Sequence, residues 1–327
     1  MNQYEFLAAQ TQFSRRDQLQ EVILQAIENA QEVFTQHTSV EIEVEGAGGF
    51  GSLYGDSELN LDTHLRTTLE TALSQCDIIR RITIEGRKED EPLIVNPHGI
   101  IDVFGDPLDG SLAMLHKGDA LGLPVSVGLA AYPAQTLFDK KLQFGDLICG
   151  AALDFRCCDL WYLNQDGCFF KGLPARTQEV ITVDIKKSIV ATEMYYGLNR
   201  WVWAVLFSDQ PKGWLRNISS ALIEQLYVAS GQFIAYLSAF QKHHEPVFTV
   251  RAIESAGGVV LDWDGKPFRS LEIDFYHGLN TPFLAAANLS VANWFLKRLP
   301  QAKQVAEDLM SQVVNNRPLQ HQGDQKI

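Results

Sequence analysis

The chain has 327 residues, of which 46% are hydrophobic and 20% charged, a composition typical of a folded globular protein and not of disordered or fibrous chains. Its formal net charge of −13 argues against general binding to nucleic acid or to anionic membranes, because those partners need a basic surface. The five cysteines form no CxxC pair, and no run approaches the roughly 20 apolar residues of a membrane span. We therefore expect a soluble, cytoplasmic protein with reduced thiols.

The apolar residues of the first part of the chain predict two helices. Apolar residues recur at helical spacing between Leu19 and Phe34, and a second helix is expected after Asp62, over 63–73. The segment at 43–58, EVEGAGGFGSLYGDSE, is rich in glycine. Because no GK[ST] sequence follows it, a surface loop is favoured over a phosphate-binding loop.

The middle of the chain is typical of β-structure. Five short segments are rich in β-branched or aromatic residues and are bounded by Gly, Pro, Asp or Asn. They are IRRITIEG at 79–86, GIIDVFGD at 99–106, LPVSVGLAAY at 123–132, LICGAALDF at 147–155 and DLWYLNQDGCFF at 159–170. These segments predict a substantial sheet.

The second half alternates between apolar stretches and helical patterns. The predicted elements are an apolar stretch at 188–196, a helix at 218–237, a second helix at 248–258 and a strand at 259–265. This order favours α/β layering. The polar C-terminal segment at 315–327 is expected to be frayed.

The segment GDPLDGS at 105–111 places two aspartates on a bend, because Pro107 fixes its own φ and Gly110 permits a sharp turn. Such a bend offers oxygen ligands for a hard cation and backbone amides for a phosphate. An Asx-type turn without a metal is the alternative for this segment taken alone. The groups in question belong to Asp106, Leu108, Asp109, Gly110 and Ser111.

The string DPLDGS resembles the signature of the Mg²⁺-dependent, lithium-sensitive phosphatases that include inositol monophosphatase and fructose-1,6-bisphosphatase. Blocks such as GDLICGAALDF, ISSALIEQLYVASGQ and ESAGGVVLDWDGKPF are similar to the inositol monophosphatase branch, and the resemblance covers about 60–290. It implies a fold of mixed α+β and α/β character, a layered α-β-α-β-α sandwich. The expected parts are an N-terminal α+β part, 1–180, with most metal ligands, and a C-terminal α/β part, 181–327, with the substrate pocket.

The resemblance also implies a set of metal ligands. In that family the two signature aspartates and the carbonyl between them bind metal, which here means Asp106, Leu108 and Asp109. An upstream glutamate at a strand end is matched by Glu85, with Glu89 and Glu91 as rivals in the same acidic loop. An acidic ligand from the C-terminal half is matched by Glu245 in HHEPVF. The implied cofactor is two to three Mg²⁺ ions, with Mn²⁺ as the alternative.

The implied mechanism is hydrolysis by a metal-activated water. The family pairs an aspartate at a helix start with the hydroxyl of the signature, and Asp62 and Ser111 match these positions. A simple helix N-cap is the alternative role for Asp62. The resemblance thus assigns catalytic roles to Asp62, Glu85 and Ser111, and phosphate contacts to Asp109, Gly110 and Ser111.

The sequence departs from both branches around the last ligand. The inositol branch has Trp-Asp where this chain has His244-Glu245, and its ring-binding glutamate is replaced by Ser238, which we keep as a substrate-binding position. The Lys-x-Arg pair of the fructose-bisphosphatase branch is replaced by Ala239, Phe240 and Gln241. Beyond the signature, His116 and Lys117 are expected at the surface.

These features predict a phosphatase that hydrolyses a small sugar or polyol phosphate. The alternatives are fructose-1,6-bisphosphatase activity, 3′-phosphoadenosine-5′-phosphate phosphatase activity, or a degenerate protein that binds metal and phosphate without catalysis. The expected partner is a small phosphorylated substrate, and neither nucleic acid nor a membrane is expected. Members of the family are often dimers, so a homodimer is compatible with the resemblance.

Overall fold

The computed structural model describes residues 3–37, 60–87, 93–111, 123–137, 141–184, 187–192, 197–208, 214–218, 220–275, 281–305 and 308. Several expectations fall outside these ranges. They concern the glycine-rich segment at 43–58, Glu89, Glu91, His116, Lys117 and the C-terminal segment at 315–327.

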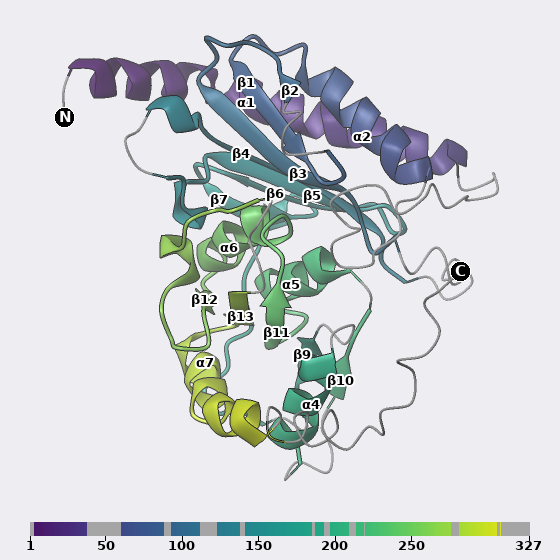
Figure 1. Ribbon diagram of the computed structural model, residues 1–327, viewed down its shortest axis with the longest axis vertical. Coiled ribbons are helices and arrows are strands. Elements are labelled where there is room, and N and C mark those ends of the chain that lie inside the picture. The colour runs from purple at the N-terminus through teal and green to yellow at the C-terminus, as the bar shows by residue number, and fades with distance from the viewer. Residues whose placement is uncertain are drawn as a thin grey trace, which may run out of the picture.

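Helical layers and sheets alternate through the molecule (Figure 1). The first layer, α1 (Gln3–His37) and α2 (Asn60–Leu73), covers the outer face of an eight-stranded sheet. The middle layer, α5 (Ala221–Ala229) and α6 (Pro246–Ser255), lies between the two sheets. The last layer, α4 (Gly197–Leu206) and α7 (Leu289–Leu296), covers the five-stranded sheet. The predicted α-β-α-β-α sandwich is confirmed.

The eight-stranded sheet has the order β2-β1-β3-β4-β5-β6-β7-β8. Its strands β1 and β3 are parallel, and every other neighbouring pair is antiparallel. The strands are β1 (Ile79–Ile84), β2 (Leu93–Ile94), β3 (Ile101–Asp109), β4 (Ser126–Pro133), β5 (Cys149–Asp154), β6 (Asp159–Asn164), β7 (Gly167–Phe170) and β8 (Leu173–Pro174). All five strand segments predicted from the sequence therefore contain strands.

The five-stranded sheet has the order β10-β9-β11-β13-β12. The first three strands in this order run parallel, and β13 is antiparallel to both of its neighbours. The strands are β9 (Ile189–Thr192), β10 (Trp214–Arg216), β11 (Ala235–Gln241), β12 (Val259–Leu261) and β13 (Thr281–Ala286). Short 3₁₀ turns lie at Gln135–Leu137, Phe144–Asp146 and Phe268–Ser270.

The helix predicted over 218–237 is wrong in its second half. The helix α5 ends at Ala229, the chain turns through Gly231 with a φ of 75°, and β11 begins at Ala235. The first five positions of β11 are all buried. A strand that is covered on both faces shows no alternation of apolar and polar residues, so its pattern resembles that of a buried helix.

Leucines at every fourth position anchor the first helical layer. Leu61, Leu65, Leu69 and Leu73 are buried along one side of α2, facing a core shared with α1 and the large sheet. The strand β3 behind this layer is buried at all nine positions, including three aspartates. A buried carboxylate needs a partner or a raised pKa, so these aspartates require an explanation. Among the described helices, none has the length and apolar character that a membrane span requires.

Candidate metal and phosphate site

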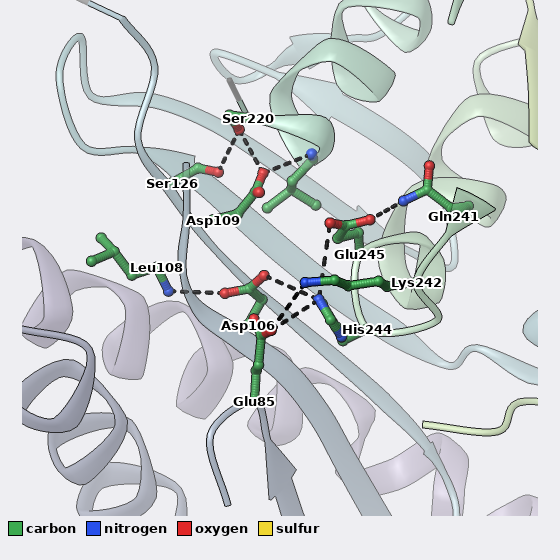
Figure 2. A network of polar contacts seen from close by, with 11 residues as sticks. Glu85, Asp106, Leu108, Asp109, Ser126, Ser220, Gln241, Lys242, His244 and Glu245 are labelled. Carbon is green, nitrogen blue, oxygen red and sulfur yellow. Dashed lines mark hydrogen bonds and ion pairs between the residues drawn. The ribbon is translucent and has the colours of Figure 1, made fainter. Parts of the chain in front are cut away.

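The parallel pairing of β1 with β3 brings two carboxylates to one edge of the large sheet. Ile84, the last residue of β1, lies opposite Gly105, and the backbone N–H of Glu85 donates to the Gly105 carbonyl over 3.0 Å. Asp106 follows directly on β3. Because parallel strands end at the same edge, the Glu85 and Asp106 side chains point into one region (Figure 2).

The first buried aspartate of β3 is a structural residue. Asp102 has no exposed surface, and Arg80 binds both of its oxygens, with Nε at 2.8 Å and Nη2 at 2.5 Å. A second guanidinium, that of Arg81, lies 3.5 Å from Asp102 Oδ2. Two arginines therefore compensate the charge of this carboxylate.

The second buried aspartate of β3 has acidic neighbours instead. Burial raises the pKa of Asp106 well above its usual value, and the charges of Glu85, Asp109 and Glu245 raise it further. Its Oδ1 accepts a hydrogen bond from the Leu108 backbone N–H at 3.0 Å. This contact is the Asx-type turn named as the alternative for the segment, and it leaves the other oxygen, Oδ2, directed at the acidic cluster.

The loop between β11 and α6 completes the cluster. It carries Lys242, His244 and Glu245, the last of which is the N-cap position of α6, before Pro246. Gln241 Nε2 donates to Glu245 Oε2, and the Tyr236 hydroxyl donates to Gln241 Oε1 over 3.0 Å. This chain of hydrogen bonds holds the Glu245 carboxylate toward His244 (Figure 2).

The imidazole of His244 lies among the three carboxylates. Its Nε2 is 3.3 Å from Glu85 Oε1, 3.9 Å from Asp106 Oδ2 and 3.9 Å from Glu245 Oε1. Glu85, Asp106 and His244 each offer one atom that could bind a metal, and these three atoms lie within 4.8 Å of one another. No other group of three such side chains occurs in the part of the chain that the structure describes.

The basic groups of this loop set the protonation of Glu85. Burial alone would raise the pKa of Glu85, but the charges of His244 and Lys242 and a hydrogen bond with Asp106 lower the pKa below its usual value. Lys242 Nζ lies 3.9 Å from Glu85 Oε1. The cluster thus pairs an ionised Glu85 with an Asp106 that holds its proton more tightly.

Asp109 is directed at the start of α5. Its Oδ2 accepts hydrogen bonds from Ser220 Oγ at 2.6 Å and from the Leu222 backbone N–H at 2.8 Å. Ser220 also caps α5, because its Oγ accepts from the Ile223 N–H, and it lies 3.1 Å from Ser126 Oγ. The N-terminus of a helix favours a negative charge, so this position stabilises the Asp109 carboxylate.

Three further residues predicted for the site are Gly110, Ser111 and Asp62. Gly110 is buried with a φ of 92°, the sharp turn expected of it, and Ser111 is partly buried directly after it. Asp62 is partly buried in the first turn of α2. Because α2 begins at Asn60, the alternative role of Asp62 as a helix N-cap is wrong.

The structure gives Ser238 a structural position. It has no exposed surface, and its hydroxyl accepts a hydrogen bond from the Phe240 N–H over 3.2 Å. It lies where the pairing of β11 with β13 is irregular, between Ser238 and Gln241. The hydroxyl is enclosed at this irregularity, and the substrate contact expected of Ser238 stays a prediction.

His244 is the site residue that the sequence analysis missed. The family resemblance marks the pair His244-Glu245 as a departure from Trp-Asp, and it implies a ligand role for Glu245 alone. The available signal was a histidine next to an expected metal ligand, since imidazole is itself a frequent metal ligand.

Comparisons with known proteins identify the fold. Neither protein-family models nor curated protein sequences match the chain. Among solved structures, the chain is similar to the extragenic suppressor protein suhB from Bartonella henselae, with 17% identity and a TM-score of 0.66 over 85% of this chain and 97% of that chain. An IMPase/NADP phosphatase complexed with Mg²⁺ and phosphate is 16% identical, with a TM-score of 0.66 over 87% of this chain and 95% of that chain.

A third structure, SaIMPase-II bound to inositol monophosphate, is 15% identical, with a TM-score of 0.63 over 89% of this chain and 98% of that chain. The same protein has also been solved with 2′AMP. At these identities the similarity establishes the fold. The chain has the inositol monophosphatase-like fold that its DPLDGS segment predicted.

Proposed function

We propose that this protein is a metal-dependent phosphatase that hydrolyses a small phosphate monoester. The observation that carries the proposal is that carboxylate oxygens of Glu85, Asp106 and Glu245, from three separate segments of the chain, all lie within 3.9 Å of His244 Nε2 (Figure 2). The fold supports it, because one solved protein with this fold holds Mg²⁺ and phosphate.

The residues present fit a divalent cation. Burial raises the pKa of Asp106, the neighbouring carboxylates raise it further, and a bound cation would offset both effects. Glu85, Asp106 and Glu245 would hold the ion, with the Leu108 carbonyl and Asp109 as the further ligands that the resemblance implies. A divalent cation supplies charge neutralisation for the phosphate and lowers the pKa of a water molecule. The family resemblance implies Mg²⁺, with Mn²⁺ as the alternative.

The chain's own residues provide the rest of the chemistry. Asp62 and Ser111 would orient the attacking water and accept its proton, and the amides of Gly110 and Ser111 would bind phosphate oxygens. Lys242 adds a positive charge beside Glu85, which favours binding of a dianionic phosphate. The Ser220 hydroxyl and the α5 N-terminus hold Asp109 in one orientation.

Both parts of the chain would contribute to this site. The N-terminal part, 1–180, provides the carboxylates at the ends of β1 and β3, and the C-terminal part, 181–327, provides the loop with Lys242, His244 and Glu245. We assign the substrate pocket to the same meeting point. The substrate class we propose is a sugar or polyol phosphate, with fructose-1,6-bisphosphate and 3′-phosphoadenosine-5′-phosphate as alternatives. The binding of 2′AMP by SaIMPase-II supports keeping the nucleotide alternative.

A non-catalytic binding protein is the second candidate. The observation that favours it is the position of two nitrogen atoms of the protein, Lys242 Nζ and His244 Nε2, within 3.9 Å and 3.3 Å of Glu85 Oε1. These groups partly neutralise the carboxylates that a cation would otherwise neutralise. A cluster with its own cations binds an additional ion less tightly, so catalysis must be measured directly.

Phosphate release tests the two candidates. The assay uses inositol-1-phosphate, fructose-1,6-bisphosphate and 3′-phosphoadenosine-5′-phosphate with Mg²⁺ or Mn²⁺, and compares wild type, Asp106→Asn and the surface control Asp166→Asn. Release by wild type and by Asp166→Asn, but not by Asp106→Asn, supports the phosphatase. Metal binding without release from any ester supports the binding protein.

A further inference from the structure

We propose that His244 is a nitrogen ligand of the metal, and that the site therefore takes a divalent transition metal such as Co²⁺ or Zn²⁺ in preference to Mg²⁺. The inference rests on the proposed function, because it concerns the cation of that same site. It goes beyond the resemblance, which implies carboxylate and carbonyl ligands alone.

The distances around the imidazole fit coordination of a common ion. Two ligand atoms that each lie 2.0–2.2 Å from one tetrahedral ion are about 3.3–3.6 Å apart. His244 Nε2 is 3.3 Å from Glu85 Oε1, and 3.9 Å from Asp106 Oδ2 and from Glu245 Oε1. One ligand atom each of Glu85, Asp106 and His244 lies within 4.8 Å of the other two, so small movements of these three side chains would bring them to one ion. Figure 2 shows the imidazole directed at the carboxylates.

Packing restricts the orientation of the imidazole. Only 10% of the His244 side chain is exposed, and its ring lies 6.0 Å from the ring of Phe275 in a tilted arrangement. Glu245, the neighbouring residue, is held by Gln241 at the start of α6. A ligand that is oriented before the metal arrives loses little conformational entropy on binding, which favours a role in coordination.

The ligand chemistry favours a transition metal. Mg²⁺ prefers oxygen ligands in octahedral geometry and retains several waters, whereas imidazole suits Zn²⁺, Cu²⁺, Fe²⁺ and Ni²⁺. A nitrogen ligand therefore strengthens the binding of first-row transition metals without a comparable gain for Mg²⁺.

The competing explanation is that His244 is protonated and pairs with Glu85 as an ion pair. In that case the imidazole competes with the metal, and its removal strengthens metal binding. The two explanations therefore predict opposite effects of a substitution at His244.

Metal titration of the apo protein distinguishes them. Co²⁺ binding is followed by visible absorption, and Co²⁺, Zn²⁺ and Mg²⁺ affinities are measured by calorimetry for wild type, His244→Asn and the control His98→Asn. His98 is exposed and precedes the start of β3, at the opposite end of the strand from Asp106. Circular dichroism and the melting temperature establish that each variant is folded.

We expect wild type and His98→Asn to bind Co²⁺ and Zn²⁺ at least about tenfold more tightly than Mg²⁺. His244→Asn should lose at least about tenfold in Co²⁺ affinity and change the visible spectrum, with little change in Mg²⁺ affinity. An unchanged Co²⁺ spectrum and affinity, or tighter binding by His244→Asn, overturns the inference. If His244→Asn does not fold, nitrogen coupling to Mn²⁺ in the wild-type protein, measured by electron spin echo, decides: coupling supports the inference, and its absence overturns it.

The outcomes for the metal and for the activity are separable. Co²⁺ bound through His244 without phosphate release from any ester supports the inference and contradicts the phosphatase. Phosphate release by wild type, together with a Co²⁺ spectrum and affinity that His244→Asn leaves unchanged, supports the phosphatase and contradicts the inference.

Discussion

The hydroxyl of Ser220, which caps α5, donates a hydrogen bond of 2.6 Å to Oδ2 of Asp109 at the end of β3. Ser220 and Asp109 are buried, at 0% and 8% exposure, and they belong to different layers, the middle helical layer and the large sheet. One serine thus starts a helix of the middle layer and fixes a carboxylate of the large sheet. The position of Asp109 therefore depends on how α5 packs against the large sheet.

The substitution Ser220→Ala should destabilise the protein by about 2–4 kcal/mol, because it removes a helix cap and leaves a buried carboxylate with one donor fewer. Urea unfolding measures the change. A double-mutant cycle with Asp109→Ala isolates the hydrogen bond from the cap. We expect a coupling energy of about 1–2 kcal/mol, and a value near zero would show that the contact contributes nothing.

The ion pair of Asp102 with Arg80 leads to a prediction about stability alone. Removal of the guanidinium in Arg80→Ala leaves Asp102 buried with Arg81 as its remaining basic neighbour, which should cost about 3–5 kcal/mol. The matched control is Arg87→Ala, because the pair of Arg87 with Glu70 is more exposed and should contribute about 1 kcal/mol or less. Thermal unfolding compares the two. Equal losses would contradict the structural role of Asp102.

The ionised carboxylate of Asp106 should destabilise the metal-free protein at neutral pH. The folded-state pKa of Asp106 is raised above its unfolded value, so the favourable contribution of the protonated carboxyl is complete below the unfolded pKa and is lost as the pH rises through the folded pKa. Asp106→Asn should therefore raise the melting temperature of the apo protein at neutral pH. The same variant should lose the stabilisation that added metal gives to wild type.

Scanning calorimetry with and without chelator tests this pair of effects. Wild type should be stabilised by metal and destabilised by EDTA, while Asp106→Asn should respond to neither. A variant that is destabilised without metal and still stabilised by metal would contradict the proposed role of Asp106.

Two neighbouring exposed thiols should differ in reactivity. All five cysteines are free, and Cys157 and Cys158 are exposed. Burial, the charge of Asp154 and a hydrogen bond to Asp154 at 3.3 Å raise the pKa of Cys157 to about 12. The thiolate is the reactive form, so a raised pKa lowers the reaction rate at a given pH. Alkylation of Cys157 should be slow at pH 7 and should rise about tenfold per pH unit up to pH 10.

Mass spectrometry of iodoacetamide-treated protein measures both sites separately. Burial is the main cause of the raised pKa of Cys157, and Asp154→Asn removes the charge that raises it further. Cys157 should therefore react faster in this variant, while Cys158 serves as the internal reference. An unchanged ratio of the two rates would show that Asp154 does not control the thiol.

Much of the fold follows from local sequence. The segments at 79–86 and 99–106 predicted strands because β-branched residues bounded by turn residues favour extended backbone, and β1 and β3 lie there. The apolar spacing between Leu19 and Phe34 lies within α1. The helix predicted over 218–237 is wrong after Ala229, where the chain leaves α5 and enters β11. A strand buried on both faces shows no alternation of apolar and polar residues that would identify it.

In the site, too, some features follow from local sequence and others from tertiary packing. The sequence by itself determined the bend that begins at Asp106, because proline and glycine act on the backbone over a few residues. Glu85 was implied only by the family resemblance, and the parallel pairing of β1 with β3 places it beside Asp106. Only the tertiary structure brought His244 within 3.3 Å of Glu85 and Ser220 within 2.6 Å of Asp109, and enclosed Ser238. These contacts join segments that are distant in the chain. They depend on how two sheets pack around α5 and α6, which no local pattern encodes.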